Sequence, residues 1–297
     1  MKQFKFKKIN AFATEKSDGN PAGMVILNDS DNISNDEMLL IAKELKGFVS
    51  EVGYVKQIDK NTFDLKYYSS EREVDFCGHA TIAIMYNLIK NSNEFIKEKH
   101  FNIITQKGKL EVENRINQEN AVYISAPQPI FSTEKISPDS IAESLKIGTN
   151  EIDDSYPVSI VNAGLETLIV PIKTLKGIIS ISPNLEELNN FCTHNGIDII
   201  IVYSQDVVNT QNKFRTRVFA PTFGYLEDPA TGSGNSALGY YLIKNKIWDG
   251  APMSIEQNGD IEYSNIIKLK AKNTKNQKYK VVFGGGAVVK IEGAYFL

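Results

Sequence analysis

Two short stretches decide the fold of this chain: Asp75-Phe-Cys-Gly-His-Ala-Thr81 and Asp228-Pro-Ala-Thr-Gly-Ser-Gly-Asn235. Each is a glycine-containing turn that leads into an apolar segment, and this pattern is typical of a helix start. The helix ends repeat too, as Tyr86-Asn-Leu-Ile-Lys-Asn91 and Tyr240-Tyr-Leu-Ile-Lys-Asn245. The spacing is constant, since 232 − 78 = 154 and 245 − 91 = 154. The chain is therefore a tandem duplication of about half its length.

The segments that flank these helices repeat with a different spacing. Phe63-Asp-Leu-Lys-Tyr-Tyr68 precedes the first turn and Phe214-Arg-Thr-Arg-Val-Phe219 precedes the second, with 214 − 63 = 151. Thr105-Gln-Lys-Gly and Glu256-Gln-Asn-Gly follow the helices at 256 − 105 = 151. Three residues are therefore inserted at the second turn. Since two copies of one module usually bury a site between them, we expect the functional site where the copies meet.

The periodicities predict an α+β fold of two similar domains. Each copy has many short strands around few helices, and the segment Ala80–Ile89 is apolar nearly all round. Such a helix must be buried, and a rolled, mostly antiparallel sheet wrapped around it would bury it. We expect one domain at residues 1–128 plus about 284–297, and the other at 129–283.

Local signals give further expectations. Ser34 and Glu37 predict a capping box, and Ser182-Pro183 predicts the start of a helix that ends near His194. Gly19-Asn-Pro-Ala-Gly23 indicates a turn, and the polar stretch Lys272–Lys278 a solvated hairpin loop.

Composition limits the partners. The 297 residues are 42% hydrophobic and 23% charged, as in globular proteins, and the net charge of −3 favours neither nucleic acid nor a membrane surface. No apolar run reaches membrane-spanning length, and the first residues lack a signal peptide pattern. Cys77 and Cys192 give no disulfide framework, so we expect a cytoplasmic protein.

The two turns predict an anion-binding site. A helix start presents unpaired N–H groups and the positive end of the helix dipole, which suits a substrate carboxylate or an enolate. Gly78 and Gly232 allow close approach of a ligand to the backbone. The alternative is that both turns are ordinary helix caps, but their duplication favours a site.

Polar side chains gather at the same turns. Thr231 and Ser233 add donors at the second turn, and Asp228 adds a carboxylate just before it. His79 follows glycine at a helix start, where the dipole favours the neutral imidazole, a suitable donor or proton shuttle. Cys77 precedes that glycine and lies within the same turn.

Cofactor and metal motifs are not evident. Asp75, Cys77 and His79 could suggest metal ligands, but the sequence has no second cluster with ligand spacing. It has no Walker loop, no dinucleotide-binding glycine motif and no nucleophile elbow. We therefore expect neither a metal nor a cofactor.

Ordered motifs along nearly the whole chain resemble the phenazine-biosynthesis isomerase family (PhzF-like). They are Gly19-Asn-Pro-Ala-Gly23, Ser50-Glu51, Cys77-Gly-His-Ala-Thr81, Glu227-Asp-Pro-Ala-Thr-Gly-Ser233, Glu256-Gln257 and the final Gly-Gly-x-x-Val run. The resemblance implies the diaminopimelate-epimerase type of fold, with the site in the cleft between two similar domains. It also implies a homodimer and isomerisation of a small carboxylate-bearing metabolite without cofactor.

The resemblance assigns roles that spacing alone does not. It implies that Glu51 moves the proton, with His79, Asp228 and Ser233 in support, and that Ser50 belongs to the substrate-binding set. That set also contains Cys77, Gly78, Thr231 and Gly232 from the turns. The apolar flank Phe48–Val55 suits a partly desolvated acid/base.

Departures from the family pattern keep two alternatives open. Val52 stands where the family often has threonine, and the stretch 258–264 lacks an arginine that the family often has. A member that binds a small molecule or a protein without turnover is one alternative. An amino-acid epimerase assisted by Cys77 is the other. Two-thiol racemisation is disfavoured, because the duplicate of Cys77 is Thr231, whose hydroxyl is far too weak an acid.

Overall fold

The computed structural model describes residues 1–273 and 279–297, which form two compact units. Unit 1 comprises Met1–Ser125 and Gly284–Leu297, and unit 2 comprises Ala126–Phe283. The centre of the expected hairpin loop at Lys272–Lys278 lies outside the described residues.

Unit 1 is a sheet in the order β18–β1–β2–β3–β4–β6–β7–β8. The pairs β2–β3 and β4–β6 are parallel and the others are antiparallel. The strands are β1 (Gln3–Ala11), β2 (Asn20–Leu27), β3 (Glu51–Asp59), β4 (Thr62–Tyr68), β5 (Glu73–Val74), β6 (His100–Thr105), β7 (Gly108–Asn114), β8 (Val122–Ser125) and β18 (Ala287–Phe296). The helices are α1 (Asn35–Glu44), α2 (Gly78–Lys90) and the short α3 (Ile116–Glu119).

Unit 2 repeats this arrangement in the order β9–β10–β11–β12–β13–β15–β16, with β11–β12 and β13–β15 parallel. Its strands are β9 (Ile130–Phe131), β10 (Ser159–Asn162), β11 (Glu166–Pro171), β12 (Ile199–Ser204), β13 (Phe214–Phe219), β14 (Glu227–Asp228), β15 (Met253–Gln257), β16 (Asn265–Asn273) and most of β17 (Tyr279–Gly285), whose last two residues belong to unit 1. Its helices are α4 (Pro138–Leu145), α5 (Leu175–Ser180), α6 (Leu185–His194) and α7 (Gly232–Lys244). The repeated sequence of parallel and antiparallel pairs confirms the expected α+β architecture.

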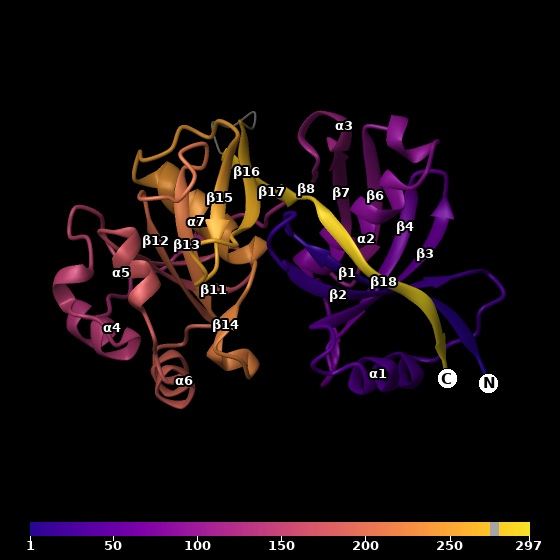
Figure 1. Cartoon of the computed structure of the whole chain (residues 1–297), viewed down its shortest axis with the longest axis horizontal. Coiled ribbons are helices and arrows are strands. Elements are labelled where there is room, and N and C mark those ends of the chain that lie inside the picture. Colours follow the sequence, from indigo (N-terminus) through magenta and orange to yellow (C-terminus); the bar gives the residue numbers. More distant parts are fainter. Residues whose placement is uncertain (274–278) are drawn as a thin grey trace. The chain divides into compact units, whose positions relative to one another are not determined.

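The expected central helices are α2 and α7, each enclosed by strands of its own unit (Figure 1). α2 contacts β1, β2, β3, β8 and β18, and nine of its residues are buried on all sides of the helix. Gly53 in β3 makes the close approach possible, because a Cβ there would overlap the side chain of Ile84. The glycine therefore brings α2 against β3, two residues after Glu51.

The predicted insertion is visible in the connections that lead to the two central helices. Tyr68 pairs with Glu73 in unit 1, across residues 69–72, whereas Phe219 pairs with Glu227 in unit 2, across residues 220–226. Four connecting residues in one unit and seven in the other account for the three extra residues. The addition contains a 3-10 turn at Pro221–Phe223.

Most local predictions agree with the structure, and two are wrong. Ser34 and Glu37 form the capping box at the start of α1. Gly19–Gly23 is not a turn throughout, since β2 already begins at Asn20 and only Gly19 has a positive φ, +68°. The N-cap of α6 is Asn184 rather than Ser182, because the Asn184 side chain accepts from two N–H groups of the first turn. The short helix α5 had no clear signal in the sequence.

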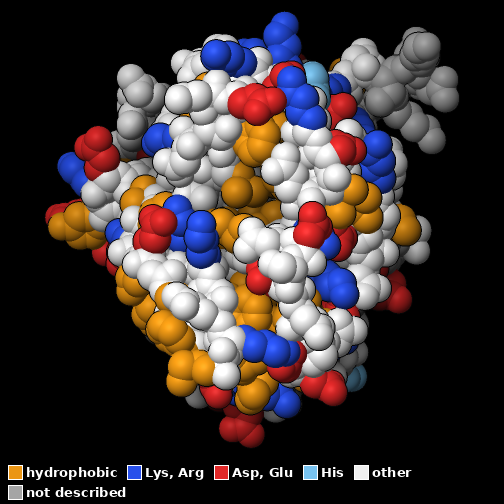
Figure 2. Space-filling model, turned by 90° about the vertical axis from the view of Figure 1, so that its right-hand side faces the viewer, with side chains coloured by type: hydrophobic (Ala, Val, Ile, Leu, Met, Phe, Trp, Pro, Cys, Tyr) orange, Lys and Arg blue, Asp and Glu red, His pale blue; other side chains and the backbone are white. Residues whose placement is uncertain are grey.

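The surface shown in Figure 2 carries interspersed positive and negative side chains, as the small net charge suggests. None of the described helices is long and apolar enough to span a membrane.

Candidate active site

Glu51 lies at the first position of β3, opposite Ala22 in the parallel neighbour β2. Its side chain is 21% exposed, so the carboxylate is partly desolvated, as the apolar flank suggested. Its neighbour Ser50 is exposed; its hydroxyl donates to Asn20 Oδ1 at 3.3 Å and its N–H to Pro21 O. Ser50 therefore anchors the start of β3 to β2.

Hydrogen bonds hold the first turn of α2, but no side chain caps the N–H groups at its start. Thr81 donates through both its N–H and its hydroxyl to the carbonyl of Cys77, at 3.0 and 2.7 Å, and Tyr67 bonds the same hydroxyl at 2.6 Å. The N-cap residue Cys77 is extended, and its side chain forms no capping hydrogen bond. The helix start at Gly78 is therefore not closed by an ordinary side-chain cap, and its N–H groups suit an anion.

Glu51, Cys77 and His79 come together at this helix start. His79 Nε2 lies 3.2 Å from Glu51 Oε2, and Cys77 Sγ lies 3.5 Å from His79 Nδ1 and 3.9 Å from Nε2. Glu51 Oε2 is buried and makes no hydrogen bond of good geometry in the described structure, although it pairs with the imidazole by distance. A buried carboxylate oxygen thus keeps a lone pair for another partner.

The surroundings of His79 shift its pKa in a direction that the sequence argument did not consider. Burial disfavours its imidazolium, but the contacts with Cys77 and with Glu51 outweigh burial and raise the pKa of His79 well above its usual value. Burial also raises the pKa of the Cys77 thiol. The sequence argument for a neutral imidazole considered the helix dipole and not a carboxylate from another strand, and the charge of His79 stays a prediction.

The second turn, in unit 2, has the same backbone but different side chains. Thr231 is the N-cap of α7, with φ −122° and ψ 112° against −129° and 111° for Cys77. Its side chain does not cap the helix either; the hydroxyl donates to Asp228 Oδ2. Asp228 is 9% exposed. Ser233 is half-buried in the first turn of α7, after the buried Gly232.

Gln257 holds this turn together, although no sequence pattern predicted a role for its side chain. Its amide oxygen accepts from Thr231 N–H at 3.0 Å and from Asn235 Nδ2 at 2.7 Å. Its amide nitrogen donates to Asp228 O at 2.8 Å and to the Thr231 hydroxyl at 3.2 Å. Gln257 is fully buried and uses its full hydrogen-bonding capacity. The sequence shows Glu256-Gln257 as a motif of the family, but only the fold shows which groups the Gln257 side chain contacts.

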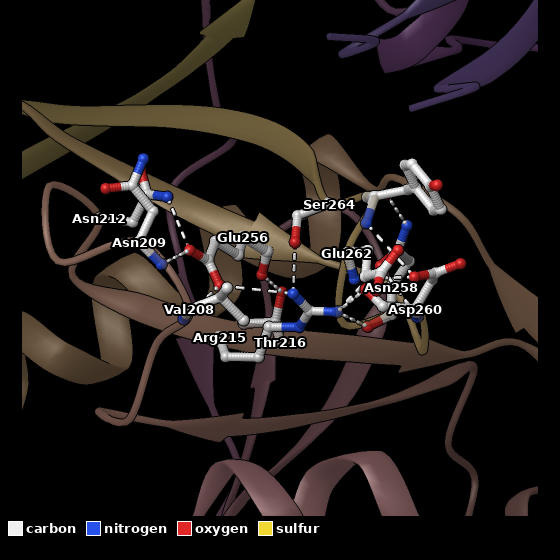
Figure 3. A network of polar contacts seen from close by, with 11 residues as sticks. Val208, Asn209, Asn212, Arg215, Thr216, Glu256, Asn258, Asp260, Glu262 and Ser264 are labelled. Carbon is white, nitrogen blue, oxygen red and sulfur yellow. Dashed lines mark hydrogen bonds and ion pairs between the residues drawn. The ribbon is translucent and has the colours of Figure 1, made fainter. Parts of the chain in front are cut away.

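A buried ion pair supports the end of β15, just before Gln257 in the chain. Arg215 and Glu256 are 0% and 1% exposed and lie 3.3 Å apart. Glu256 also accepts from the N–H groups of Val208 and Asn209, whereas the guanidinium donates to the carbonyl and the side chain of Asn258 (Figure 3). The pair therefore fixes the loop that follows β15.

The duplication does not extend to the two acidic groups proposed for the site, Glu51 and Asp228. The pair Tyr67 and Val74 in unit 1 corresponds to Val218 and Asp228 in unit 2, so the counterpart of Asp228 is an apolar residue. Glu51 opens β3, and the residue that opens the matching β12 is Ile199. The two turns have similar backbone angles, but the acidic residue is Glu51 in β3 in unit 1 and Asp228 in β14 in unit 2.

One group of side chains among the described residues has the types and spacing for a metal ion: Glu51, Cys77 and His79, whose ligand atoms all lie within 4.8 Å of one another. Asp75, which the sequence placed beside the other two, is exposed and outside this group.

The chain is similar to known proteins over nearly its whole length. The family model of phenazine biosynthesis-like proteins matches residues 9–293. The sequence is 27% identical to an uncharacterized isomerase of Clostridium acetobutylicum, over 97% of each chain. It is 26% identical to a trans-2,3-dihydro-3-hydroxyanthranilate isomerase of Pseudomonas fluorescens, over 94% of this chain and 95% of the relative.

The fold agrees with this similarity. The crystal structure of a PhzF-family protein of Bacillus anthracis superposes with a TM-score of 0.88 at 24% identity, over 100% of both chains. The chain therefore belongs to the phenazine biosynthesis-like protein family, as one of its isomerases.

Proposed function

We propose that this isomerase moves a proton on a small carboxylate-bearing substrate, with Glu51 as the acid/base. The observation that carries the proposal is the buried Glu51 oxygen, which makes no hydrogen bond of good geometry in the described part of the chain and lies 3.2 Å from His79. Glu51 would accept the proton in its carboxylate form, beside the imidazole of His79. Family membership supports isomerisation, and the geometry supports Glu51 as the group that performs it.

The reaction is a redox-neutral proton shift. The Glu51 carboxylate takes a proton from an sp³ carbon of a conjugated substrate, and the electron pair of the C–H bond moves into the π-system. The protonated Glu51 then returns that proton to another carbon of the same system. One C–H bond breaks, another forms and the double bond moves, so the proposed step needs no external cofactor.

Helix starts supply the binding groups in this proposal. The N–H groups at the start of α2, after Gly78, suit the substrate carboxylate or the enolate-like charge that develops during the shift. The start of α7, at Gly232 and Ser233, offers donors of the same kind beside the carboxylate of Asp228. We propose His79 and Asp228 as the groups that orient substrate and balance charge.

The similarity to the Pseudomonas relative suggests the first compounds to test. A panel of cyclic unsaturated carboxylates, with trans-2,3-dihydro-3-hydroxyanthranilate among them, and of amino acids is incubated in deuterated water with the wild type and with Glu51→Gln. Nuclear magnetic resonance follows product formation, and mass spectrometry follows deuterium uptake. We expect conversion of a cyclic carboxylate with the wild type and none with Glu51→Gln.

Binding and chemistry are measured separately. Calorimetry with the same compound should give similar affinities for both proteins, because glutamine keeps the shape of glutamate. Full turnover by Glu51→Gln would overturn the role of this residue, and equal loss of binding and turnover would show that it only binds. A compound that binds but is never converted, with a stable protein partner in pull-down, would favour the non-catalytic alternative.

A Cys77-assisted epimerase remains the second candidate, because this thiol lies within reach of both His79 and Glu51. Burial raises its pKa, which counts against a thiolate base, and the matching Thr231 is already hydrogen-bonded to Asp228. Chiral analysis of amino acids incubated with Cys77→Ala decides the question: racemisation that disappears in this variant would favour the epimerase.

A further inference from the structure

We propose that Glu51, Cys77 and His79 form a binding site for one thiophilic divalent cation, with Zn²⁺ as its best occupant, and that this ion blocks the acid/base. The inhibition rests on the proposed function, whereas the binding site does not. A metal at these residues is an inhibitor in this proposal and takes no part in turnover.

The separations match the dimensions of a zinc site. Typical Zn–S, Zn–N and Zn–O bonds of about 2.3, 2.0 and 2.1 Å at tetrahedral angles place the ligand atoms about 3.3 to 3.6 Å apart. His79 Nε2 is 3.2 Å from Glu51 Oε2 and 3.9 Å from Cys77 Sγ. The remaining edge, from Sγ to the carboxylate, lies within 4.8 Å, so a small rotation of the Glu51 side chain completes the triangle.

The backbone holds these ligands in place without the metal. Cys77 and His79 belong to one turn, whose Cys77 carbonyl is fixed twice by Thr81. Glu51 opens β3, which Gly53 brings against α2. Since two ligands come from one turn and the third from an adjacent strand, little conformational entropy is lost when the ion binds.

The donor set selects the ion. Thiolate sulfur favours Zn²⁺ and similar soft ions, and disfavours Mg²⁺ and Ca²⁺, which prefer sites made of oxygen atoms. Three protein ligands leave the fourth position to water. The ion binds a thiolate and a neutral imidazole, so the thiol proton and any proton on the ligating ring nitrogen leave to solvent.

One observation besides the spacing supports a further partner at this oxygen. Glu51 Oε2 is buried and makes no hydrogen bond of good geometry with any described residue, and its contact with the His79 imidazole at 3.2 Å is one of distance only. A cation bound by His79 and Cys77 would satisfy this oxygen. The same oxygen is the one proposed to accept the substrate proton, so a bound ion excludes the reaction.

Cobalt gives a direct test. Co²⁺ is added to the metal-free protein, and its absorption spectrum reports both a sulfur ligand, through a thiolate-to-cobalt charge-transfer band, and tetrahedral geometry, through intense visible bands. Zn²⁺ is then titrated against a chromophoric chelator. We expect one equivalent of each metal, the sulfur band with the wild type, and its loss in Cys77→Ser.

Matched variants separate this site from adventitious binding. His79→Gln and Glu51→Gln should each weaken Zn²⁺ binding at least tenfold, about the smallest effect that loss of a metal-site partner has. Cys192→Ser removes the buried thiol of α6, and His100→Gln removes an exposed imidazole, so both should bind like the wild type. Binding that none of the three ligand substitutions weakens, or a Co²⁺ spectrum without the sulfur band, would overturn the site.

The two proposals fail in different ways. If the site exists and Glu51 is the acid/base, equimolar Zn²⁺ stops turnover of a converted substrate and a chelator restores it. If Zn²⁺ binds at Cys77 while turnover continues unchanged, the inhibition is refuted together with the role of Glu51 as the acid/base. If Zn²⁺ does not bind but Glu51→Gln is inactive, the metal site is refuted and the proposed function stands.

Discussion

His79 Nε2 lies 3.2 Å from Glu51 Oε2, although the two residues are 28 positions apart in the chain (79 − 51) and come from a helix and a strand. The sequence pattern indicated His79, because it lies at a helix start. Only the family resemblance indicated Glu51. Together with the contacts of Cys77, the contact with Glu51 raises the pKa of His79.

Removing the carboxylate should lower the pKa of His79. Burial favours the neutral imidazole, and the Cys77 and Glu51 contacts raise the pKa against it. In Glu51→Gln the charge that favours the imidazolium is gone, so we expect the His79 pKa to fall, measured by NMR titration of its ring. Glu111→Gln, which changes the exposed neighbour of His100, is the control and should leave His79 unchanged.

The contact between His79 and Glu51 predicts that the free energy of unfolding depends on pH. Because the His79 pKa is raised on folding, its contribution is complete below the unfolded value near 6.5 and is lost as pH rises through the folded pKa. The free energy of unfolding of the wild type should therefore exceed that of Glu51→Gln most on the acid side of this window. Denaturant titrations across the window measure this, and a difference that grows with pH would contradict it.

Gln257 should matter for stability beyond its own packing. Replacing it with leucine removes its hydrogen bonds to the Thr231 N–H, the Asn235 amide and the Asp228 carbonyl. Each buried group that loses such a bond costs about 1 to 3 kcal/mol, so we expect a loss of more than about 3 kcal/mol in urea unfolding. Gln106→Leu is the matched control: it alters the duplicate position, whose exposed side chain bonds Glu73, and should change little.

The buried pair in unit 2 should be more costly to break than a surface pair. Arg215→Met leaves the Glu256 charge buried, and we expect a loss of about 3 to 5 kcal/mol of unfolding free energy. Arg115→Met breaks an exposed pair with Glu119 and should cost at most about 1 kcal/mol. Similar losses in both variants would refute this account of the network in Figure 3.

Lowering the pH should weaken the ion pair between Arg215 and Glu256. Burial opposes the charge of Glu256, but hydrogen bonds from Asn212, Asn209 and Val208 and the Arg215 charge outweigh it and lower its pKa. This contribution is present above the unfolded pKa and is lost as pH falls through the folded value. The stability difference between wild type and Glu256→Gln should therefore shrink on acidification; a constant difference would argue against it.

Asn258 has φ 136°, a conformation that favours glycine, in the loop that Arg215 holds. Asn258→Ala keeps the strain and loses the side-chain bonds to Arg215 and to the Tyr263 carbonyl. Asn258→Gly loses the same bonds but relieves the strain. Glycine should therefore be the more stable variant by about 1 kcal/mol in thermal unfolding; an alanine variant of equal stability would show that no strain is stored there.

Much of the fold follows from short-range patterns in the sequence. The glycine turns and the apolar segments after them specify two central helices, because a helix that is apolar on all sides has to be enclosed. The change of spacing from 151 to 154 residues specifies the insertion, which the structure has between β13 and β14. The start of α6 and the strand at Asn20 were misread, because polar and proline residues fit caps, turns and strand ends alike.

Short-range patterns predict only part of the candidate site. Cys77 and His79 share one turn, so the sequence alone placed them together, and it identified Thr231 near Asp228 for the same reason. Glu51 and Gln257 have no local signal, since each reaches its partner through pairing of strands distant in the chain. The sequence thus determined the duplicated architecture and the two helix starts. Only the tertiary structure decided which groups shift the pKa of His79 and which side chains bond to Thr231. The reason is that electrostatic and hydrogen-bond energies depend on distances in space.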